Sequence, residues 1–327
     1  MTLTSAVGAS RGSGNLKMTP GRWVAVALAV PVALALIGWT GFTLVSTVAR
    51  GSYPFSYAVP VRGGQTTVEV NGGNVTLRQT SGGAARLTGT VQYGLVRPGI
   101  TDSNTAGGTS VGINCDGIAS DCGMNAVLEV PLPTGVTLSS NGGDIVIPRF
   151  DGHLTLSSGG GNIDSSYLGG ILRIVTDGGD LTSTALYGTM QVFTGGGNIN
   201  AGDVGGTVRL ETGGGDVTAN SLAGPVQILT GGGNVNANGV SAQFINVMSG
   251  GGDVTLVFTQ PPLDLQVTAN GGNVTVVLPS GRTKYDILTP ASDGGNVNVQ
   301  SSLVSPGSPY TITVESGGGD VTITQAS

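Results

Sequence analysis

The chain has 327 residues, a formal net charge of −6 and a charged fraction of only 10%, while 59 of its residues are glycine. An acidic chain without a patch of Lys or Arg is unsuited to nucleic acid, whose phosphates demand a basic face. The two cysteines and the single histidine are too few to form a metal clip from these residue types. Composition therefore argues against nucleic acid as a partner and gives no reason to expect a metal.

The first predicted element is a membrane-spanning helix over residues 23–48. These 26 residues carry no charge, and at 1.5 Å per residue they are long enough to cross a hydrocarbon core of about 30 Å. Three basic residues and no acidic residue precede them. The positive-inside rule therefore predicts a cytoplasmic tail over residues 1–22 and places the chain after Arg50 outside the cytoplasm, as in a single-pass protein of the cell membrane.

A cleaved signal peptide is the alternative for the same segment. Thr47 and Ala49 offer a small-residue cleavage pattern before Arg50. The apolar residues continue through Val45, beyond a usual signal core, so an uncleaved anchor is the first choice, and both alternatives export the remainder of the chain. Residues 49–65, rich in Pro, Gly and aromatic residues, are predicted to form a linker.

Residues 66–327 are predicted to form one extracytoplasmic domain built from strands, which begin near Thr67. Within it, the segment 96–126 is rich in Gly, Ser, Thr and Asp and is expected to be an irregular loop. This loop contains Cys115 and Cys122. Outside the cytoplasm such a pair favours a disulfide, and two free thiols are the alternative.

A Gly-Gly pair followed by Asn or Asp recurs eleven times in this domain. The interval is 18 residues from Asp144 through Asn234, and the last three intervals lengthen to 20, 23 and 24. Such a period marks one supersecondary unit repeated along an axis. The polar residues that we assign to a corner ladder are Asp144, Asn162, Asp180, Asn198, Asp216, Asn234, Asp253 and Asn273, and the motif also occurs at Asn74, Asn296 and Asp320.

The residue after each ladder position is aliphatic, and this column is predicted to belong to the core. Further apolar columns lie eight and six residues before the motif, with the two-residue period of a strand, and six residues after it. About four inward side chains cannot offset the entropy of ordering an 18-residue rung, so the rungs must stack. The core column consists of Ile145, Ile163, Leu181, Ile199, Val217, Val235, Val254 and Val274.

The predicted fold is all-β: a parallel β-solenoid, similar to a β-helix, with about 18–24 residues per rung and one transmembrane helix before it. Constant spacing suits coils in which each residue lies about 4.8 Å above its counterpart, rather than a row of antiparallel hairpins. Glycine is expected at the corners, where the chain needs positive φ or a close backbone approach.

The corner ladder alternates Asp and Asn from Asp144 to Asn273. Stacked in that order, like charges lie two rungs apart, about 9 to 10 Å. We hypothesise that the Asn amides donate hydrogen bonds to the neighbouring Asp carboxylates. The alternative is that Asn and Asp are simply two acceptable turn residues.

The ladder carboxylates are also the obvious candidates for catalysis, because paired acids at such separations can hydrolyse a glycoside. These acids recur with the corners, however, as structure requires, and neither aromatic sugar platforms nor clustered Arg and Lys accompany them in the sequence. We therefore predict that the protein is not an enzyme.

Two further chemistries receive little support from the sequence. His153 lies between rungs beside Asp151, which is typical of a solvated turn histidine rather than a general base. Calcium-binding coils of 18 residues carry two Gly- and Asp-rich corners per turn, whereas only one is evident here. We expect neither a catalytic residue nor a metal, and no cofactor.

The run Leu128-Glu-Val-Pro-Leu-Pro-Thr-Gly-Val136 is followed by Ser140-Asn-Gly-Gly-Asp-Ile-Val146 and then by successive Gly-rich rungs. This pattern resembles the bacterial putative-adhesin, or toast-rack, family of β-strand-repeat domains over about residues 66–325. The resemblance implies a membrane-tethered, right-handed β-helix-like domain at the bacterial envelope, in a family of unknown function often linked to envelope stress. It brings no catalytic residues to carry over.

The predicted function is that of a membrane-anchored, extracytoplasmic, non-catalytic adhesin-like module of the cell envelope. Outward Thr, Ser, Asn and Gln side chains suit contact with a cell-wall polymer, a glycan or an envelope protein. The alternative is a scaffold or sensor in an envelope-stress response. Because no capping segment follows the final strand near Tyr310 to Thr324, self-association through a C-terminal edge strand is a further expectation.

Overall fold

The computed structural model describes residues 51–327, apart from 95, 106–107, 115–121 and 290–293. Gly51–Ser327 forms one compact unit. Among these described residues no helix has the length and apolar character that a membrane span requires. The predicted span 23–48 lies outside the described residues and stays a prediction.

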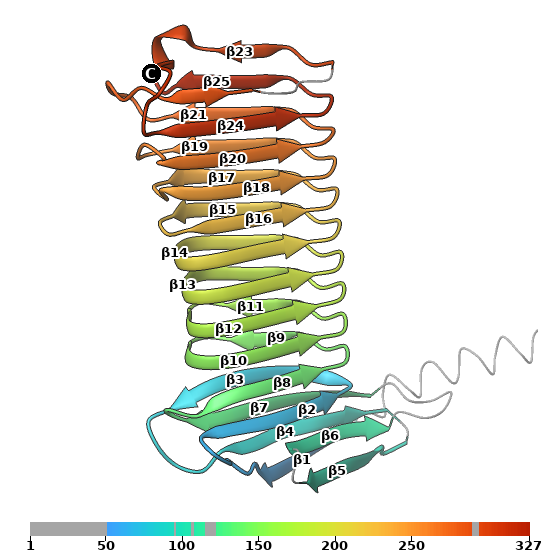
Figure 1. The fold of residues 1–327 in the computed structure, drawn as a ribbon. Helices are drawn as coiled ribbons and strands as arrows, with labels where there is room; N and C mark the ends of the chain where they lie inside the picture. Colours follow the sequence, from blue (N-terminus) through green and yellow to red (C-terminus); the bar gives the residue numbers. More distant parts are fainter. Residues whose placement is uncertain (1–50, 95, 106–107, 115–121, 290–293) are drawn as a thin grey trace, which may run out of the picture. The chain divides into compact units, whose positions relative to one another are not determined.

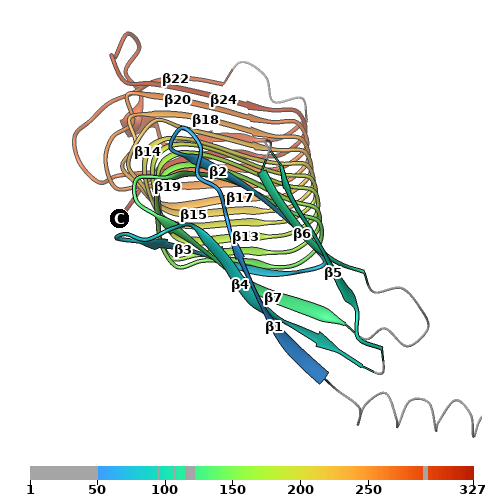
Figure 2. The same ribbon diagram turned by 90° about the horizontal axis from the view of Figure 1, so that it is seen from below.

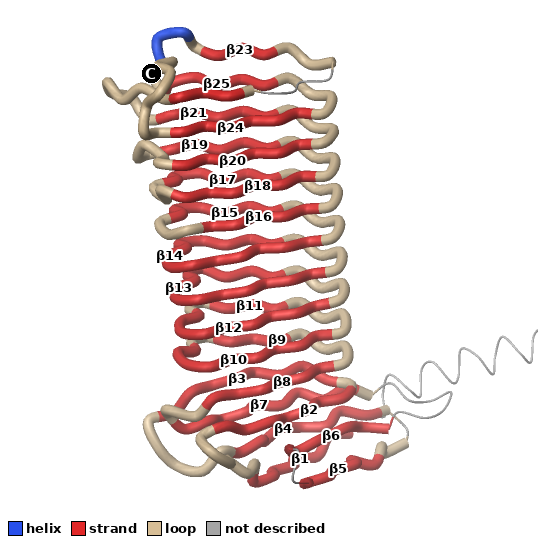
Figure 3. Tube along the Cα trace, viewed as in Figure 1, coloured by secondary structure: helices blue, strands red, loops and turns tan. Residues whose placement is uncertain are grey.

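In the described part of the chain, twenty-five strands form one continuous sheet that winds into a stack of coils with two faces (Figures 1 and 3). The first face, called face A, contains β2 (Gln65–Asn71), β8 (Gly135–Ser140), β10 (Phe150–Ser158), β12 (Leu168–Thr176), β16 (Val226–Thr230), β18 (Phe244–Ser249), β20 (Asp264–Ala269), β24 (Thr311–Ser316) and β22 (Asp286–Leu288). The opposite face, called face B, contains β3 (Gly73–Thr80), β9 (Ile145–Ile147), β11 (Ile163–Ser165), β15 (Val217–Leu222), β17 (Val235–Val240), β19 (Val254–Phe258), β21 (Val274–Leu278), β25 (Val321–Gln325) and β23 (Val297–Val299). The long strands β13 (Leu181–Thr194) and β14 (Ile199–Thr212) contribute to both faces.

Neighbouring strands of the stack are parallel, and the register repeats with the sequence period. Leu154 lies beside Leu172, and Leu172 lies beside Met190. Viewed down the stack, the coils overlie one another (Figure 2). The aliphatic columns therefore merge into one interior, and all eight residues of the predicted core column, from Ile145 to Val274, are at most 1% exposed.

The interior includes a column on face B that the sequence reading missed. It lies three residues after each ladder position, and its side chains are small in the middle of the stack and large at both ends. Ser165 and Ser183 occupy it in adjacent coils, and the Ser165 hydroxyl donates to the Ser183 hydroxyl at 2.8 Å. Further members are Ile147, Ala201, Ala219, Ala237, Leu256, Val276 and Ile323.

The predicted linker over residues 49–65 is wrong for Gly51–Ala58, which forms strand β1. This strand pairs antiparallel with β4 (Arg86–Tyr93), which pairs antiparallel with β7 (Gly123–Pro131), and β7 lies parallel to β3 on face B. Its aromatic residues recur at every second position, so that Phe55 is buried. Pro54 is tolerated because β1 is an edge strand with no partner on its outer side among the described residues.

The predicted irregular loop over 96–126 is also wrong in large part. Within it β5 (Gly99–Thr105) and β6 (Gly108–Asn114) form an antiparallel hairpin, and β6 lies parallel to β2 on face A. The Ser- and Thr-rich composition suits the largely exposed β5, whereas Thr109 and Val111 of β6 are buried, and the segment lacks a long apolar run. Cys122 immediately precedes β7, whereas Cys115 lies outside the described residues, so the disulfide stays a prediction.

At the C-terminal end, chain order and stack order differ. Strands β24 and β25 pair with β20 and β21 on one side and with β22 and β23 on the other. The final segment therefore inserts beneath the coil that precedes it in sequence (Figure 1). The predicted open edge at Tyr310 to Thr324 is wrong, because the edge belongs to β22 and β23, which have three residues each. Short edge strands limit pairing with other chains.

Candidate functional site: a polar groove along face A

A hydrogen-bonded ladder runs along the Gly-rich corners, which align on one side of the stack (Figure 3). The backbone N–H of each motif residue donates to the side-chain Oδ1 of the motif residue in the adjacent coil, at distances between 2.7 and 3.0 Å. The bond from Asn162 N to Asp144 Oδ1, at 2.9 Å, is typical. The predicted ladder residues Asp144 to Asn273 therefore satisfy backbone donors that a sharp corner leaves free.

The alternation of Asp and Asn extends over the whole stack, in stack order rather than chain order. Asp144 N donates to Asn74 Oδ1 at 2.9 Å. At the other end Asp320 N donates to Asn273 Oδ1, and Asn296 N donates to Asp320 Oδ1. The inserted strands thus place Asp320 between two asparagines that follow each other in the sequence.

Four asparagine amides also donate to the adjacent carboxylate, as the ladder hypothesis requires. The Nδ2 atoms of Asn198, Asn234 and Asn273 lie 3.1 to 3.3 Å from the Oδ1 of the preceding aspartate. Asn296 Nδ2 lies 3.2 Å from Asp320 Oδ1. The carboxylates are therefore engaged in stacking the coils, and no cluster of three or more metal-ligating side chains occurs in the described part of the chain.

A second, buried ladder of hydroxyls lies at the same corner and was missed from the sequence. Thr194 Oγ1 accepts from Gly197 N at 3.0 Å and donates to Gly179 O of the adjacent coil at 3.1 Å. A Ser or Thr four residues before the ladder position was the available signal. Its buried members are Ser158, Thr176, Thr194, Thr212, Thr230, Ser249 and Ser316, and the Ser140 hydroxyl at the same position has no hydrogen-bond partner among the described residues.

Glycine also shapes the opposite corner, which the sequence reading did not recognise as Gly-rich. Gly170, Gly188 and Gly206 stack in adjacent coils with φ of 102°, 111° and 103°. A Cβ on Gly188 would lie 2.2 Å from Gly170 O, so other residues are excluded by both φ and space. This turn directs the side chains of Tyr187 and Thr189 outward on either side of Gly188.

Face A carries a shallow groove that runs along the stack. Two hollows of about 310 and 300 Å³ share Thr189 and Gln191 and together extend from β2 to β20. Nine strands separated by about 4.8 Å give the groove a length of about 38 Å. The groove is therefore elongated along the axis of the stack.

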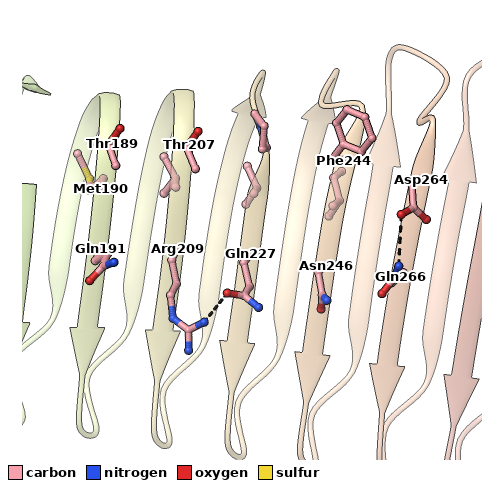
Figure 4. A pocket seen from close by; sticks show the side chains of 14 residues that line it. Thr189, Met190, Gln191, Thr207, Arg209, Gln227, Phe244, Asn246, Asp264 and Gln266 are labelled. Carbon is pink, nitrogen blue, oxygen red and sulfur yellow. Dashed lines mark hydrogen bonds between the residues drawn. The ribbon is translucent and has the colours of Figure 1, made fainter. Parts of the chain in front are cut away.

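The groove is lined by a row of long polar side chains, one per strand, which lie side by side (Figure 4). Arg173 Nη1 donates to Gln191 Oε1 at 3.1 Å, and Arg209 donates to Gln227. Arg209 is also ion-paired with Glu211 at 2.6 Å. The row comprises Arg173, Gln191, Arg209, Gln227, Asn246 and Gln266.

Apolar side chains form part of the groove wall. Ile171 is 56% exposed and Phe244 is 47% exposed. The predicted turn residue His153 instead lies in β10 and lines the groove with them. Asp264 is the single acidic residue among the described residues that line it, so the groove does not bring two carboxylates together. The described lining therefore consists mainly of amide, hydroxyl, guanidinium and apolar groups.

The family model described as Toastrack DUF4097 matches residues 6–324. A solved structure of a putative adhesin from Bacteroides fragilis is 16% identical with a TM-score of 0.42, covering 84% of this chain and 97% of that chain. A putative cell adhesion protein from Clostridium sporogenes is 12% identical with a TM-score of 0.17, covering 84% of this chain and 100% of that chain. No curated protein matches.

Proposed function

Since the chain belongs to the Toastrack DUF4097 family, we propose that it is an adhesin-like binding module of the bacterial cell envelope. In this proposal residues 23–48 anchor it in the membrane, the coils lie outside the cytoplasm, and it binds an extended partner without catalysing a reaction. The charge-free segment and the basic residues before it support the anchor and the orientation.

The groove on face A is the observation that carries the proposal. Its amide and guanidinium side chains recur on successive strands at about 4.8 Å, so a polymer lying along the stack meets a similar set of donors and acceptors at each coil. Repeated weak contacts along one rigid surface add up to useful affinity. The Asp carboxylates of the corner ladder accept hydrogen bonds from the adjacent coil, which supports a structural role for them rather than a catalytic one.

The test blocks the groove at its centre. Thr189, which lines both halves of the groove, is replaced by Trp, and the full chain in detergent micelles is sedimented with purified bacterial cell-wall polymer. The matched control is Thr182→Trp, because Thr182 is an exposed threonine of the same strand on face B. Trp is well tolerated in strands, so both variants should fold. We expect loss of sedimentation for Thr189→Trp only, and equal binding by both variants contradicts the proposal.

The sensor alternative predicts a different outcome. Deleting residues 2–20 leaves a binding module intact but abolishes a stress response that acts through the tail. A chain that binds no cell-wall polymer, yet loses a measured envelope-stress response on this deletion, would overturn the adhesin-like assignment in favour of the sensor. Proteinase K added to intact cells tests the orientation, because it should digest the coils only if they lie outside.

A further inference from the structure

Two tyrosines from adjacent coils form an aromatic strip at the corner beside the groove. The rings of Tyr167 and Tyr187 have centroids 5.8 Å apart and planes inclined by 31°. The Arg149 guanidinium lies over the Tyr167 ring, 4.3 Å from its centroid. No aromatic sugar platform is evident in the sequence, because these tyrosines are separated by 20 residues and only the register of the coils brings them together.

Glycines make room for both rings. A Cβ on Gly205 would lie 2.7 Å from the Tyr187 ring, and a Cβ on Gly169 would lie 3.0 Å from the Tyr167 ring. Each ring therefore rests against main chain where a side chain would otherwise stand. Tyr187 nevertheless remains 40% exposed, so much of its ring is available for contact from outside.

The strip continues into the groove through strand β13. Tyr187, Thr189 and Gln191 are alternate residues of this strand, and Thr189 and Gln191 line the groove. Four residues of strand span at most about 13 Å, and the exposed Ile171 of the adjacent strand β12 flanks this path. One ligand can therefore contact the aromatic strip and the groove at the same time.

Two guanidinium groups stand at this end of the groove. The described residues that line its N-terminal half include Arg173 and no Asp or Glu, and Arg149 adds a guanidinium at the strip, where Asp151 of β10 lies beside Gly169. Arg173 is exposed and its guanidinium contacts the neutral amide of Gln191. It is therefore available to pair with a carboxylate of a ligand, with the strength of a charge-assisted hydrogen bond.

From this juxtaposition we propose that the N-terminal half of the groove binds a linear acidic polysaccharide. The proposal rests on the proposed binding function and names its ligand class. The C–H face of a sugar ring packs on the Tyr187 ring, whose face carries partial negative charge. Sugar carboxylates pair with Arg173, and Thr189 and Gln191 exchange hydrogen bonds with hydroxyls. Single-stranded nucleic acid also offers rings and anions, and its binding is the competing outcome that the experiment below distinguishes.

The experiment measures binding of the full chain in detergent micelles to alginate, a linear polymer of uronic acids. Tyr187→Ala should weaken binding about fivefold, in line with the loss of one stacking contact. Tyr187→Leu keeps an apolar side chain over Gly205 and should weaken it similarly if the aromatic ring is what matters. Phe193→Ala is the matched control, because Phe193 is also 40% exposed and on β13 but does not line the groove.

A second pair of matched substitutions tests how much positive charge contributes to alginate binding. Arg173→Gln should weaken alginate binding and reduce its dependence on salt, whereas Arg78→Gln, which removes the same charge from β3 on face B, should leave both unchanged. Neutral dextran should bind more weakly than alginate. Polyglutamate, which is acidic without sugar rings, should bind weakly and be insensitive to Tyr187→Ala.

Equal binding of polyglutamate and alginate, or equal affinity for Tyr187→Ala and Phe193→Ala, overturns the sugar assignment. Preferential binding of single-stranded DNA overturns it in favour of nucleic acid. If Thr189→Trp abolishes binding to cell-wall polymer while alginate does not bind, the proposed function stands and this inference fails. If Thr189→Trp has no effect on either polymer, both fail.

Discussion

The central coils stack in chain order, whereas the coils at the C-terminal end do not. From Asp144 to Asp253 each coil lies on the one that precedes it in the chain, with a register of 18 or 19 residues. After β21 the chain skips one level, forms β22 and β23, and returns to insert β24 and β25 beneath them. The hydrogen-bond separation across the ladder there becomes 47 and then 24 residues.

The comparison shows that Asp and Asn alternate between coils that are adjacent in the stack, and not between motifs that are adjacent in the chain. In the centre the alternation of Asp and Asn is visible in the sequence. At the end the sequence reads Asn273, Asn296, Asp320, yet the stack reads Asn273, Asp320, Asn296. An inserted final segment also removes the exposed last strand that simple stacking would leave. Removing the inserted strands β24 and β25 should therefore destabilise the C-terminal end more than any other change.

Deleting residues 310–327 should have the largest effect. It removes four fully buried side chains, Ile312, Val314, Val321 and Ile323, whose burial contributes about 6 to 12 kcal/mol, and separates β22 and β23 from the rest of the sheet. Hydrogen exchange should show loss of protection in β20 to β23 with β10 and β12 unchanged. Retained protection in β22 and β23 would mean that they stack directly on β20 and β21. Deletion of residues 326–327 is the control.

Replacing a closely packed corner glycine by Ala should give the next largest loss of stability. A Cβ on Gly215 would lie 2.1 Å from Gly197 O, whereas nothing lies within 4 Å of one on Gly214. Gly215→Ala should therefore destabilise the protein by about 3 kcal/mol, and Gly214→Ala by no more than about 0.5 kcal/mol, as measured by denaturant unfolding.

The same pair at the inserted coil tests the stack order. A Cβ on Gly319 would lie 2.3 Å from Gly272 O, and one on Gly318 meets nothing within 4 Å. Gly319→Ala should therefore be as costly as Gly215→Ala, and Gly318→Ala nearly silent. Similar small effects for all four substitutions would show that the coils are not in close backbone contact.

Replacing an Asn of the corner ladder by Asp should lower the thermal midpoint by a smaller amount that depends on salt. Asn273 lies between Asp253 and Asp320, as Asn198 lies between two aspartates, while Asn296 contacts Asp320 only. Each new adjacent carboxylate pair costs about 1 kcal/mol at low salt. Asn273→Asp should therefore lower the thermal midpoint about twice as much as Asn296→Asp and about as much as Asn198→Asp.

Chain-order stacking makes the opposite prediction, because Asn273 and Asn296 would then each have one acidic neighbour and equal effects. Added salt should reduce all three effects. Asn200→Asp, an exposed substitution on face B outside the ladder, is the control for one additional charge. An unchanged midpoint in all the ladder variants would favour the reading that Asn and Asp are interchangeable turn residues.

Alkaline pH should destabilise the C-terminal end, and this is the smallest of the expected effects near neutral pH. Burial, with a contribution from Tyr310, raises the pKa of Tyr285 at the C-terminal end to about 12 from its usual 10.0. The folded state therefore favours the neutral phenol, so this contribution to stability is complete below pH 10 and is lost as pH rises towards 12. The central coils should show no such loss.

Tyr285→Phe should remove this pH dependence while changing stability at pH 7 by less than about 1 kcal/mol, because the buried hydroxyl has no hydrogen-bond partner among the described residues. Hydrogen exchange of β22 and β24 between pH 9 and 11, corrected for the intrinsic rate, provides the measurement. A pH dependence that persists in Tyr285→Phe would assign it to another group.

Several parts of the fold could be predicted because the repeat imposes them locally. Ile163 and Leu181 follow their ladder residues directly, and a two-residue period around Leu154 marks a strand, so core columns were visible in the sequence. The small side chains of the inner column on face B, such as Ser183 and Ala201, were not recognised because small and polar residues do not form a hydrophobic pattern.

The groove and the aromatic strip were harder to predict. The two-residue period of the strands places Arg209 and Gln227 between core positions and so facing outward, but a groove depends on what stands on both sides of them. Tyr167 and Tyr187 occupy different positions within their rungs, so the 18-residue period does not align them. Their contact depends on the lean of each ring over a glycine, which only the packed corner provides.

The sequence by itself determined that coils of a fixed period stack in parallel, because constant spacing of Gly, Asn or Asp and an aliphatic residue puts the same corner and the same buried position in each coil. Only the tertiary structure decided the order of the last coils, the pairing of β1 with β4 and of β5 with β6, and the groove on face A. These depend on pairing between segments far apart in the chain, whose energies come from contacts that no local pattern records.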